Sequence, residues 1–431
     1  MVDLPATSKA GWRAAPGVLF AVLFCINALN YTDRYVLPAV ASLIQPDLSL
    51  SDTQLGLLGT AFLLVYALAV LPAGTIADRS RRTGLLSGGI AFWSLATLLT
   101  GFTRSFGQIF AARALLGIGE STYSPASTTL IADSYPIERR ARMLSWWGTA
   151  SLVGVFLGFA MGGIVGEQFG WRAAFYGTAV PGLIAAALIR LLREPRRGAN
   201  ENLKNDGHNL SFGGTMRSLL RIPSLRASIV AQVLAYFIIG GVGFWVPYYM
   251  SQRFNQDAAT AGVLAGGMIV VGGGIGTVIG GYSSDGLLAR GLSGARLFVP
   301  AIGFLIAAPL MLVAVLTNSL PIFLAMTFLA TGFLQAGNGP LLALVQDVVI
   351  PARRARAMAV TLLFAHLFGD ALAPSAIGAL SDSLGSLQHA LLITPLALLA
   401  AGVVGLVGYR WVGRDRQTAV QDAGALASIQ V

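Results

Sequence analysis

Four charged side chains lie in segments that are otherwise apolar. Asp33 and Arg34 interrupt CINALNYTDRYVLPAV, and Arg113 and Glu120 interrupt ARALLGIGESTYSPAS. A charge at the depth of a bilayer is costly unless it is paired or faces water, so such residues are functional candidates. A carboxylate beside an arginine stays ionised until that pairing changes, and it can then take up a proton. The four residues therefore indicate a proton relay, and the plainer alternative is a buried ion pair that only joins two helices.

Helix geometry places Arg113 and Asp33 at a similar depth. Arg113 and Glu120 are separated by about two helical turns, so both project from one face of their helix. At about 1.5 Å per residue, Arg113 lies roughly 11 Å below the outer surface. Asp33, counted from the inner end of its own segment, comes to nearly the same level. We therefore expect these groups to line one side of a central cavity.

The elements that position the charged residues are membrane-spanning helices. Of the 431 residues, 55% are hydrophobic and only 11% are charged, whereas soluble domains carry about 25% charged residues. A helical span needs roughly 20 apolar residues. This rule predicts an all-α membrane protein with about twelve spans, over residues 17–43, 53–77, 83–102, 106–132, 142–166, 172–192, 225–250, 260–283, 296–316, 320–346, 356–380 and 389–411.

The distribution of basic residues orients the chain. The formal net charge is +10, which by itself is compatible with nucleic-acid binding. With the N-terminus inside, only Arg104, Arg172 and Arg253 of the basic residues between spans fall on the outer side. This asymmetry follows the positive-inside rule and predicts that both termini are cytoplasmic. Short, arginine-rich loops are typical of a bacterial protein, so we expect a multi-pass protein of the cell inner membrane and no nucleic-acid partner.

The chain divides into two similar halves. Asp78 in GTIADRSRR recurs as Asp285 in GGYSSDGLLAR, and Asp133 in IADSYPIERRAR recurs after a similar interval as Asp347 in VQDVVIPARRAR. Parallel halves of six spans around a central site are the architecture of a rocking transporter. We expect an N-terminal six-helix bundle over 1–193, a cytoplasmic linker over 194–224 with a short helix near 211–221, a C-terminal six-helix bundle over 225–412, and a cytoplasmic tail over 413–431.

Acidic and basic residues meet at the cytoplasmic ends of the second and fourth spans. Asp78, Arg79 and Arg82 lie in GTIADRSRR, and Asp133 ends the fourth span. A carboxylate there can pair with the arginines or approach the positive N-terminus of a helix in the other half. We expect these residues to gate the conformational change through contacts that form in one access state and break in the other. The alternative is that the arginines only anchor the topology.

Glycines spaced by four residues predict close packing between helices in the lipid. The stretch GGGIGTVIGG lacks the G-x-G-x-x-G spacing and a preceding strand, so we expect no dinucleotide and no other cofactor or metal. The glycines with this spacing are Gly154, Gly158, Gly162 and Gly166, and Gly276 and Gly280.

The second half carries little charge in its spans. His366 and Asp370 lie four residues apart, on one helix face, in AHLFGDALAPS. No third metal ligand and no activated serine or cysteine accompanies them, so we expect a structural hydrogen bond, or a secondary role in protonation, and not an enzyme.

Aromatic residues of the seventh span are candidates for an apolar wall of the cavity. A charged wall on one half and an apolar wall on the other suit an amphiphile whose polar head meets Arg113. The residues that we assign to the substrate cavity are Asn30, Tyr31, Phe244, Trp245 and Tyr248.

These motifs together resemble the major facilitator superfamily and, within it, the Spinster family. GTIADRSRR and RALLGIGE are similar to motifs of the whole superfamily. NYTDRY, GESTYSPASTTLIAD, RARMLSWW and VVIPARRARAMAV followed by HLFGDALAPSAIGALSDSLG are similar to Spinster lipid transporters. The resemblance implies a major facilitator fold of two pseudo-symmetric six-helix bundles and proton-driven alternating access, with lysophospholipid or sphingolipid-like substrates. It also implies that Asp33 and Glu120 are protonatable and that Arg34 and Arg113 pair with them or with a head group.

We therefore expect a monomeric transporter that couples protons to an amphiphilic lipid across the bilayer. One alternative is an organic-anion/proton symporter of the same superfamily, which shares NYTDR and RALLGIGES. Another is an efflux transporter for small amphiphiles such as drugs. The LIAD and HLFGDA segments favour the Spinster interpretation.

Overall fold

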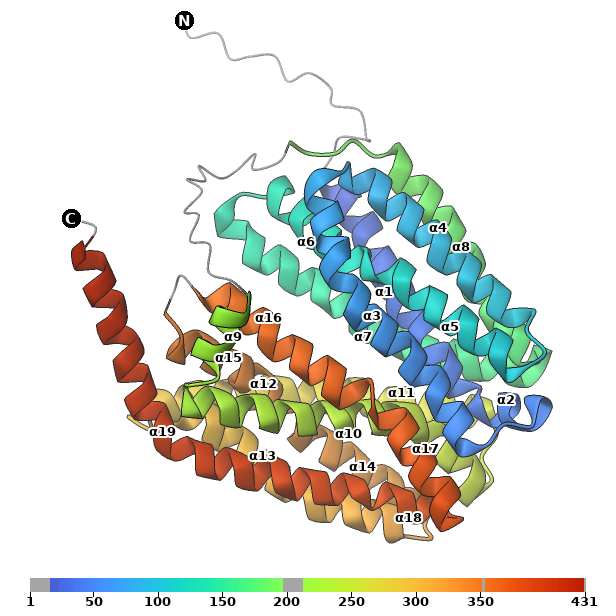
Figure 1. Ribbon diagram of the computed structural model, residues 1–431. Helices are drawn as coiled ribbons and strands as arrows, with labels where there is room; N and C mark the ends of the chain where they lie inside the picture. The colour runs from blue at the N-terminus through green and yellow to red at the C-terminus, as the bar shows by residue number, and fades with distance from the viewer. Residues whose placement is uncertain (1–15, 197–211, 351–352, 430–431) are drawn as a thin grey trace, which may run out of the picture.

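The computed structural model describes residues 16–196, 212–350 and 353–429, and all secondary structure in these ranges is helical. Figure 1 shows two helical bundles that lie side by side, built from the first and second halves of the chain. The first bundle comprises α1 (Pro16–Ala39), α2 (Ala41–Leu48), α3 (Asp52–Arg79), α4 (Arg82–Gly101), α5 (Phe106–Ser121), α6 (Tyr123–Ser134), α7 (Ile137–Phe169) and α8 (Trp171–Leu191).

The second bundle follows a short helix, α9 (Phe212–Leu219). Two of its membrane segments contain a π-helical stretch, η2 or η4. Its elements are α10 (Pro223–Phe254), α11 (Ala258–Gly267), η2 (Met268–Gly272), α12 (Gly273–Ala289), α13 (Ala295–Leu316), α14 (Leu320–Gln335), α15 (Asn338–Val348), α16 (Arg354–Phe364), η4 (Ala365–Asp370), α17 (Ala373–Leu384), α18 (Leu387–Leu391) and α19 (Ile393–Ile429).

Ten helical segments of the described chain are long and apolar enough to cross a membrane. The two expected spans that are not among them are 17–43 and 106–132, so the number twelve is not confirmed. These two segments carry the four charged residues, which lower their mean hydropathy. The second of them is also divided by a turn at Thr122, between α5 and α6. The chain is thus a multi-pass membrane protein whose least apolar membrane segments contain the candidate site.

The predicted close packing at spaced glycines is confirmed. An added Cβ at Gly158 of α7 would lie 2.6 Å from the carbonyl oxygen of Thr32 in α1, which only a glycine avoids. Gly154 and Gly162 also face α1, whereas Gly166 faces Val40 and Leu43 just after it, so α7 holds α1 at close range over several turns. In the second half, Gly276 and Gly280 of α12 face the backbone of α14 and the residue after it in the same way. Helix α1, which carries Asp33 and Arg34, is therefore positioned by backbone contact with α7.

The described parts of the segments between and after the bundles contain helices. Helix α9 lies where a short linker helix was predicted, and residues 197–211 of the expected linker lie outside the described residues. Within the expected tail over 413–431, α19 continues without a break to Ile429. Asp415 on this extension accepts a hydrogen bond from the Ser224 backbone N–H at 2.9 Å and so caps the start of α10. The C-terminal extension therefore fixes the position at which the second bundle begins.

Candidate substrate and proton site

An ion pair between α1 and α5 forms the centre of the candidate site. The Nε–H of Arg34 donates to Oε2 of Glu120 at 2.7 Å. The Glu120 side chain is 0% exposed and that of Arg34 is 16% exposed. Because two helices far apart in sequence supply the partners, the pair depends on the assembled bundle. One carboxylate and one guanidinium predicted from the sequence are thus brought together.

Aromatic rings surround the Arg34 guanidinium. Its central carbon lies 4.5 Å from the ring centroid of Tyr66, 5.0 Å from that of Tyr31 and 5.2 Å from that of Phe62. The guanidinium of Arg113 lies 5.1 Å from the same Phe62 ring. Cation–π contacts of this kind stabilise a cation that has lost most of its water. The Phe62 ring therefore contacts both the Arg34 and the Arg113 guanidinium.

Asp33 and Arg113 are both buried, and within the described residues they form no ion pair with each other. Each is 2% exposed, and Oδ2 of Asp33 accepts from the Thr97 hydroxyl at 3.4 Å. Three buried atoms have no hydrogen-bond partner among the described residues: Oδ1 of Asp33, Nε of Arg113 and Oε1 of Glu120. A buried polar atom without a partner is costly. The site therefore contains buried hydrogen-bonding atoms that no group of the described chain satisfies in this state.

A cavity of about 300 Å³ lies beside these residues, between the two halves of the molecule. Arg34 and Arg113 line it, whereas Asp33 and Glu120 lie behind its wall. Of the residues assigned to the cavity from the sequence, Tyr31 and Phe244 line it. The second half also contributes Tyr236, Ile239, Gly240, Gly243, Gln335, Asn338, His366, Asp370 and Pro374.

Three of the residues assigned to the cavity lie elsewhere. Asn30 is 2% exposed and buried inside the first bundle. The Trp245 indole N–H donates to the Pro374 carbonyl at 3.1 Å, and the ring is fully buried. Tyr248 contacts Gln45 and Asp52 at one end of the molecule, away from the cavity residues. The apolar wall is therefore made by fewer aromatic side chains than the sequence suggested.

His366 and Asp370 form the polar part of the second half's wall. His366 Nδ1 lies 2.9 Å from Asp370 Oδ2, and both residues belong to η4. The Tyr236 ring meets the imidazole edge-on at a centroid distance of 5.1 Å. The expected hydrogen bond between residues four apart is thus present, and it faces the same cavity as Arg34.

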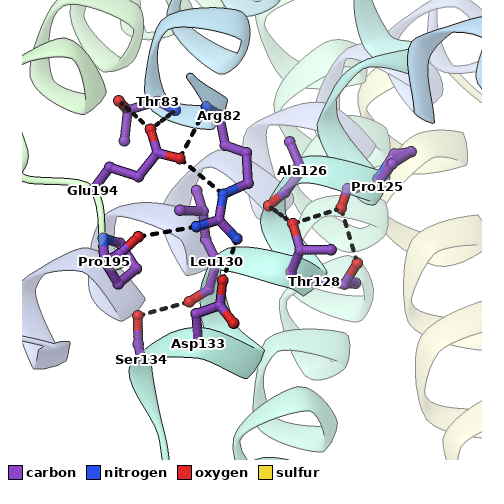
Figure 2. Close-up of polar contacts among 11 residues, drawn as sticks. Arg82, Thr83, Pro125, Ala126, Thr128, Leu130, Asp133, Ser134, Glu194 and Pro195 are labelled. Atoms are coloured by element: carbon purple, nitrogen blue, oxygen red, sulfur yellow. Dashed lines mark hydrogen bonds and ion pairs between the residues drawn. The ribbon is translucent and has the colours of Figure 1, made fainter. Parts of the chain in front are cut away.

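A second polar cluster ties three chain segments of the first half together around Arg82, at the start of α4. We define the Arg82 cluster as Arg82, Asp133, Glu194 and Pro195, and Figure 2 shows its contacts. The Arg82 guanidinium contacts Asp133 Oδ2 at 2.5 Å and Glu194 Oε1 at 2.9 Å, and it donates to the Pro195 carbonyl at 3.0 Å. The pairing of Asp133 with a neighbouring arginine is therefore present. Asp78 and Arg79 form the exposed last turn of α3.

Glu194 is a residue that the sequence analysis missed. It accepts from the backbone N–H groups of Arg82 and Thr83 at 3.2 and 3.4 Å, and so caps the start of α4. Partial burial alone raises the pKa of Glu194, but the bonds from Arg82 and Thr83 outweigh burial and hold the pKa below its usual range. Its signal in the sequence is an acid in REPRR directly after the sixth span, where the surrounding residues are basic.

The second half repeats part of this arrangement. Arg296, at the start of α13, contacts Asp285 Oδ1 at 2.5 Å and Asp347 Oδ2 at 3.4 Å. The interval along the chain from Arg82 to Arg296 equals the interval from Asp133 to Asp347. The duplication seen in the sequence thus corresponds to equivalent ion pairs in the two bundles.

Comparison with known proteins agrees with this architecture. The family model of the Major Facilitator Superfamily matches residues 23–313. Protein spinster homolog 3 of Danio rerio is 31% identical over 444 residues, covering 96% of this chain and 89% of the relative. A second relative from Danio rerio, the sphingosine-1-phosphate transporter SPNS2, is 30% identical over 454 residues, covering 96% of this chain and 88% of the relative.

The fold is also found in a solved structure. A bacterial homologue of the human lysosomal transporter Spinster, in an inward-facing and unoccupied conformation, superposes with a TM-score of 0.80. The alignment covers 96% of this chain and 99% of that chain at 24% identity. Family match, relatives and fold agree with the motifs and with the two-bundle architecture. The chain is a membrane transport protein of the Major Facilitator Superfamily and belongs to its Spinster family.

Proposed function

We propose that this protein is a proton-coupled secondary active transporter of amphiphilic lipids that works by alternating access. The observation that carries the proposal is the Arg34–Glu120 pair at the wall of the cavity, with Arg113 beside it. One relative is a sphingosine-1-phosphate transporter, and this lipid carries an anionic phosphate at the end of a single long hydrocarbon chain. We place the protein in the cell inner membrane with both termini in the cytoplasm, on the distribution of its arginines.

The guanidinium of Arg34 is the element that recognises the head group. A phosphate or carboxylate that enters the cavity competes with Glu120 for this cation. Arg113 lines the same cavity and adds a second positive charge. The aromatic rings around Arg34 keep its guanidinium in place when the ion pair with Glu120 breaks. An anionic head group therefore gains two cationic partners on entering.

Proton coupling follows from the burial of Glu120. Once the head group occupies Arg34, the Glu120 carboxylate remains 0% exposed and loses its cation. A buried carboxylate without a partner neutralises itself by taking up a proton. Asp33, next to Arg34 on α1 and 2% exposed, is the second proton site. Binding of substrate and binding of protons are thus linked through one exchange of partners at Arg34.

The size of the cavity indicates which part of the substrate it holds. Its volume of about 300 Å³ is at the lower end for small-molecule sites, which measure roughly 300–1,000 Å³. This volume suits a head group, and the alkyl chain then lies against apolar residues such as Ile239, Phe244 and Pro374 of the second half. An organic anion needs the arginines but not this wall.

Transport by purified protein in liposomes tests the proposal. The substrates are a labelled lysophospholipid, sphingosine-1-phosphate and a short organic acid, each with and without an imposed pH gradient. Gradient-dependent movement of either lipid, absent in Glu120→Gln protein, supports the proposal. Movement of the organic acid alone rejects it in favour of an organic-anion/proton symporter. Lipid or drug movement that ignores the pH gradient rejects the proton coupling.

A further inference from the structure

Two carboxylates at one end of the molecule reach from one half to the start of a helix in the other half. Asp382 of α17 accepts from the backbone N–H groups of Asp52 and Thr53, at the start of α3, at 3.1 and 2.9 Å. Glu167 of α7 accepts from the backbone N–H of Ala258, at the start of α11, at 3.0 Å. We call these contacts the α3–α17 clasp and the α7–α11 clasp.

The two clasps are related by the internal repeat of the chain. Glu167 in the first half corresponds to Asp382 in the second, and Asp52 corresponds to Ala258. The number of residues between the members of each pair is nearly the same as between the repeated aspartate motifs of the two halves. The residues before these helices, Ser51 and Asp257, have nearly the same extended backbone, with φ of −74° and −66° and ψ of 164° and 161°. The same interaction has therefore been kept in both copies of the repeat, which a chance contact at one surface would not explain.

Close backbone packing beside each clasp repeats as well. An added Cβ at Gly378 would lie 3.1 Å from the Thr53 Cα, and one at Gly163 would lie 3.2 Å from the Ala259 Cα. The interval between these two glycines equals the interval between Glu167 and Asp382. The helix starts are therefore pressed against the opposite half, where a carboxylate can reach their free N–H groups.

The physical strength of a clasp comes from the helix terminus. The first N–H groups of a helix have no partner within the helix, and the helix dipole places positive potential there. A carboxylate supplies both the acceptor and the complementary charge. Ser381 adds a hydrogen bond to Asp52 Oδ2 at 2.5 Å on the α3–α17 side, and the Thr60 hydroxyl donates to that of Ser375 at 3.0 Å.

These contacts lie at the end of the molecule where α2, α11 and α17 come together in Figure 1. The charge distribution predicts that this end faces outward. We propose that Asp382 and Glu167 are gate-positioning residues for the transport cycle: they hold the outer end closed, and opening to the outside requires both clasps to break. The proposal needs the two halves to rock, but it does not depend on the identity of the substrate or on proton coupling.

Spin-label distances in the full-length protein test the gate. Cys25 is the only cysteine in the chain, so a Cys25→Ser background leaves room for introduced labels. One label pair, Ser105→Cys with Leu316→Cys, reports the outer end, and Leu191→Cys with Ala289→Cys reports the inner end. All four side chains are exposed, with one of each pair in each half. The readout is the ratio of outward-open to closed populations.

Loss of both clasps should open the outer end. Asp382→Ala and Glu167→Ala should each raise the ratio about 2- to 5-fold, and the double variant by roughly the product, because each removes one charge–helix contact. The outer distance then lengthens while the inner distance shortens. The Asp382→Asn with Glu167→Gln variant keeps side-chain size and should give a smaller shift in the same direction. It replaces the double alanine variant in the experiment if that variant does not fold.

Asp257 offers a matched control on one of the same helices. It caps α11 from within its own half, by accepting from Thr260 N–H at 2.7 Å. Asp257→Asn removes a charge at this end but keeps a capping side chain and crosses no interface, so the populations should not change. Unchanged distances in the folded double variant, or an equal shift in Asp257→Asn, overturn the proposal. Because no substrate is used, this outcome is separate from a failure of lipid transport.

Discussion

Arg82 of α4 and Arg296 of α13 occupy equivalent places in the two halves, and each binds two carboxylates. The shared partner is the acid that ends the following transmembrane segment, Asp133 or Asp347. The other partner differs: Glu194 at the start of the linker serves Arg82, and Asp285 on α12 serves Arg296. In the first half, the second acidic partner comes from the linker, which is thereby attached to α4. In the second half, the corresponding partner comes from the transmembrane helix α12.

Glu194 should stabilise the protein at neutral pH and not in strong acid. Its pKa is lowered on folding by the bonds from Arg82 and Thr83. The contribution is therefore fully present above the ordinary glutamate pKa of about 4.3 and is lost as the pH falls through the lowered value. Thermal unfolding of Glu194→Gln and of the parent protein should differ at pH 7 and converge in acid. A difference that grows toward acid would contradict the assigned contacts.

Removal of Arg34 should destabilise the protein through the partner that it leaves behind. Arg34→Met leaves the Glu120 carboxylate buried and unpaired, and breaking a buried pair in this way costs up to about 3–5 kcal/mol. Glu120→Gln in the same protein removes the orphaned charge and should recover a large part of the loss. Denaturation in detergent measures both variants. Equal instability of the single and double variants would show that the pair is not the cause.

Asp33→Asn and Glu120→Gln should uncouple transport from the pH gradient. Both carboxylates are almost fully buried, and neither amide can take up or release the proton that the exchange at Arg34 requires. We expect lipid exchange down its own gradient to persist while gradient-driven accumulation falls at least roughly tenfold, a change of about 1.4 kcal/mol. Glu138→Gln, an exposed carboxylate at the start of α7, is the control. Full pH-driven accumulation in both the Asp33→Asn and the Glu120→Gln variant removes these residues from the coupling.

Gly158→Ala should weaken the packing of α1 on α7. The added methyl group meets the Thr32 carbonyl, which belongs to a helix backbone and cannot turn away, so we expect a loss of about 1–3 kcal/mol. Gly148 lies on the same helix with no atom within 4 Å of an added Cβ. Gly148→Ala should therefore be neutral or stabilise by about 0.4–1 kcal/mol. Melting temperatures of the two variants test the contrast directly.

The sequence predicted the central features of the fold and site because their signals are local. Charges within apolar segments identified Arg34 and Glu120, and a spacing of four residues identified the glycines that face α1. The sequence did not predict which aromatic residues of the seventh span line the cavity, because α10 is buried on most sides. No polar face of this helix distinguishes Phe244, which lines the cavity, from Trp245 and Tyr248, which do not. The acid in REPRR marks Glu194 only as unusual among basic residues. Its partners, and those of the two clasps, depend on which helix ends meet in three dimensions, and a single sequence does not show that.

The Arg34–Glu120 pair also has a consequence for the synthesis of the chain. The two residues are 86 positions apart, so at about 5–20 residues per second the ribosome makes Glu120 roughly 4–17 s after Arg34. During that interval the first helix carries a cation whose partner does not yet exist. Helix α1 must therefore wait beside water or the insertion machinery until α5 arrives, and substitutions at Glu120 will lower the yield of inserted protein as well as its activity.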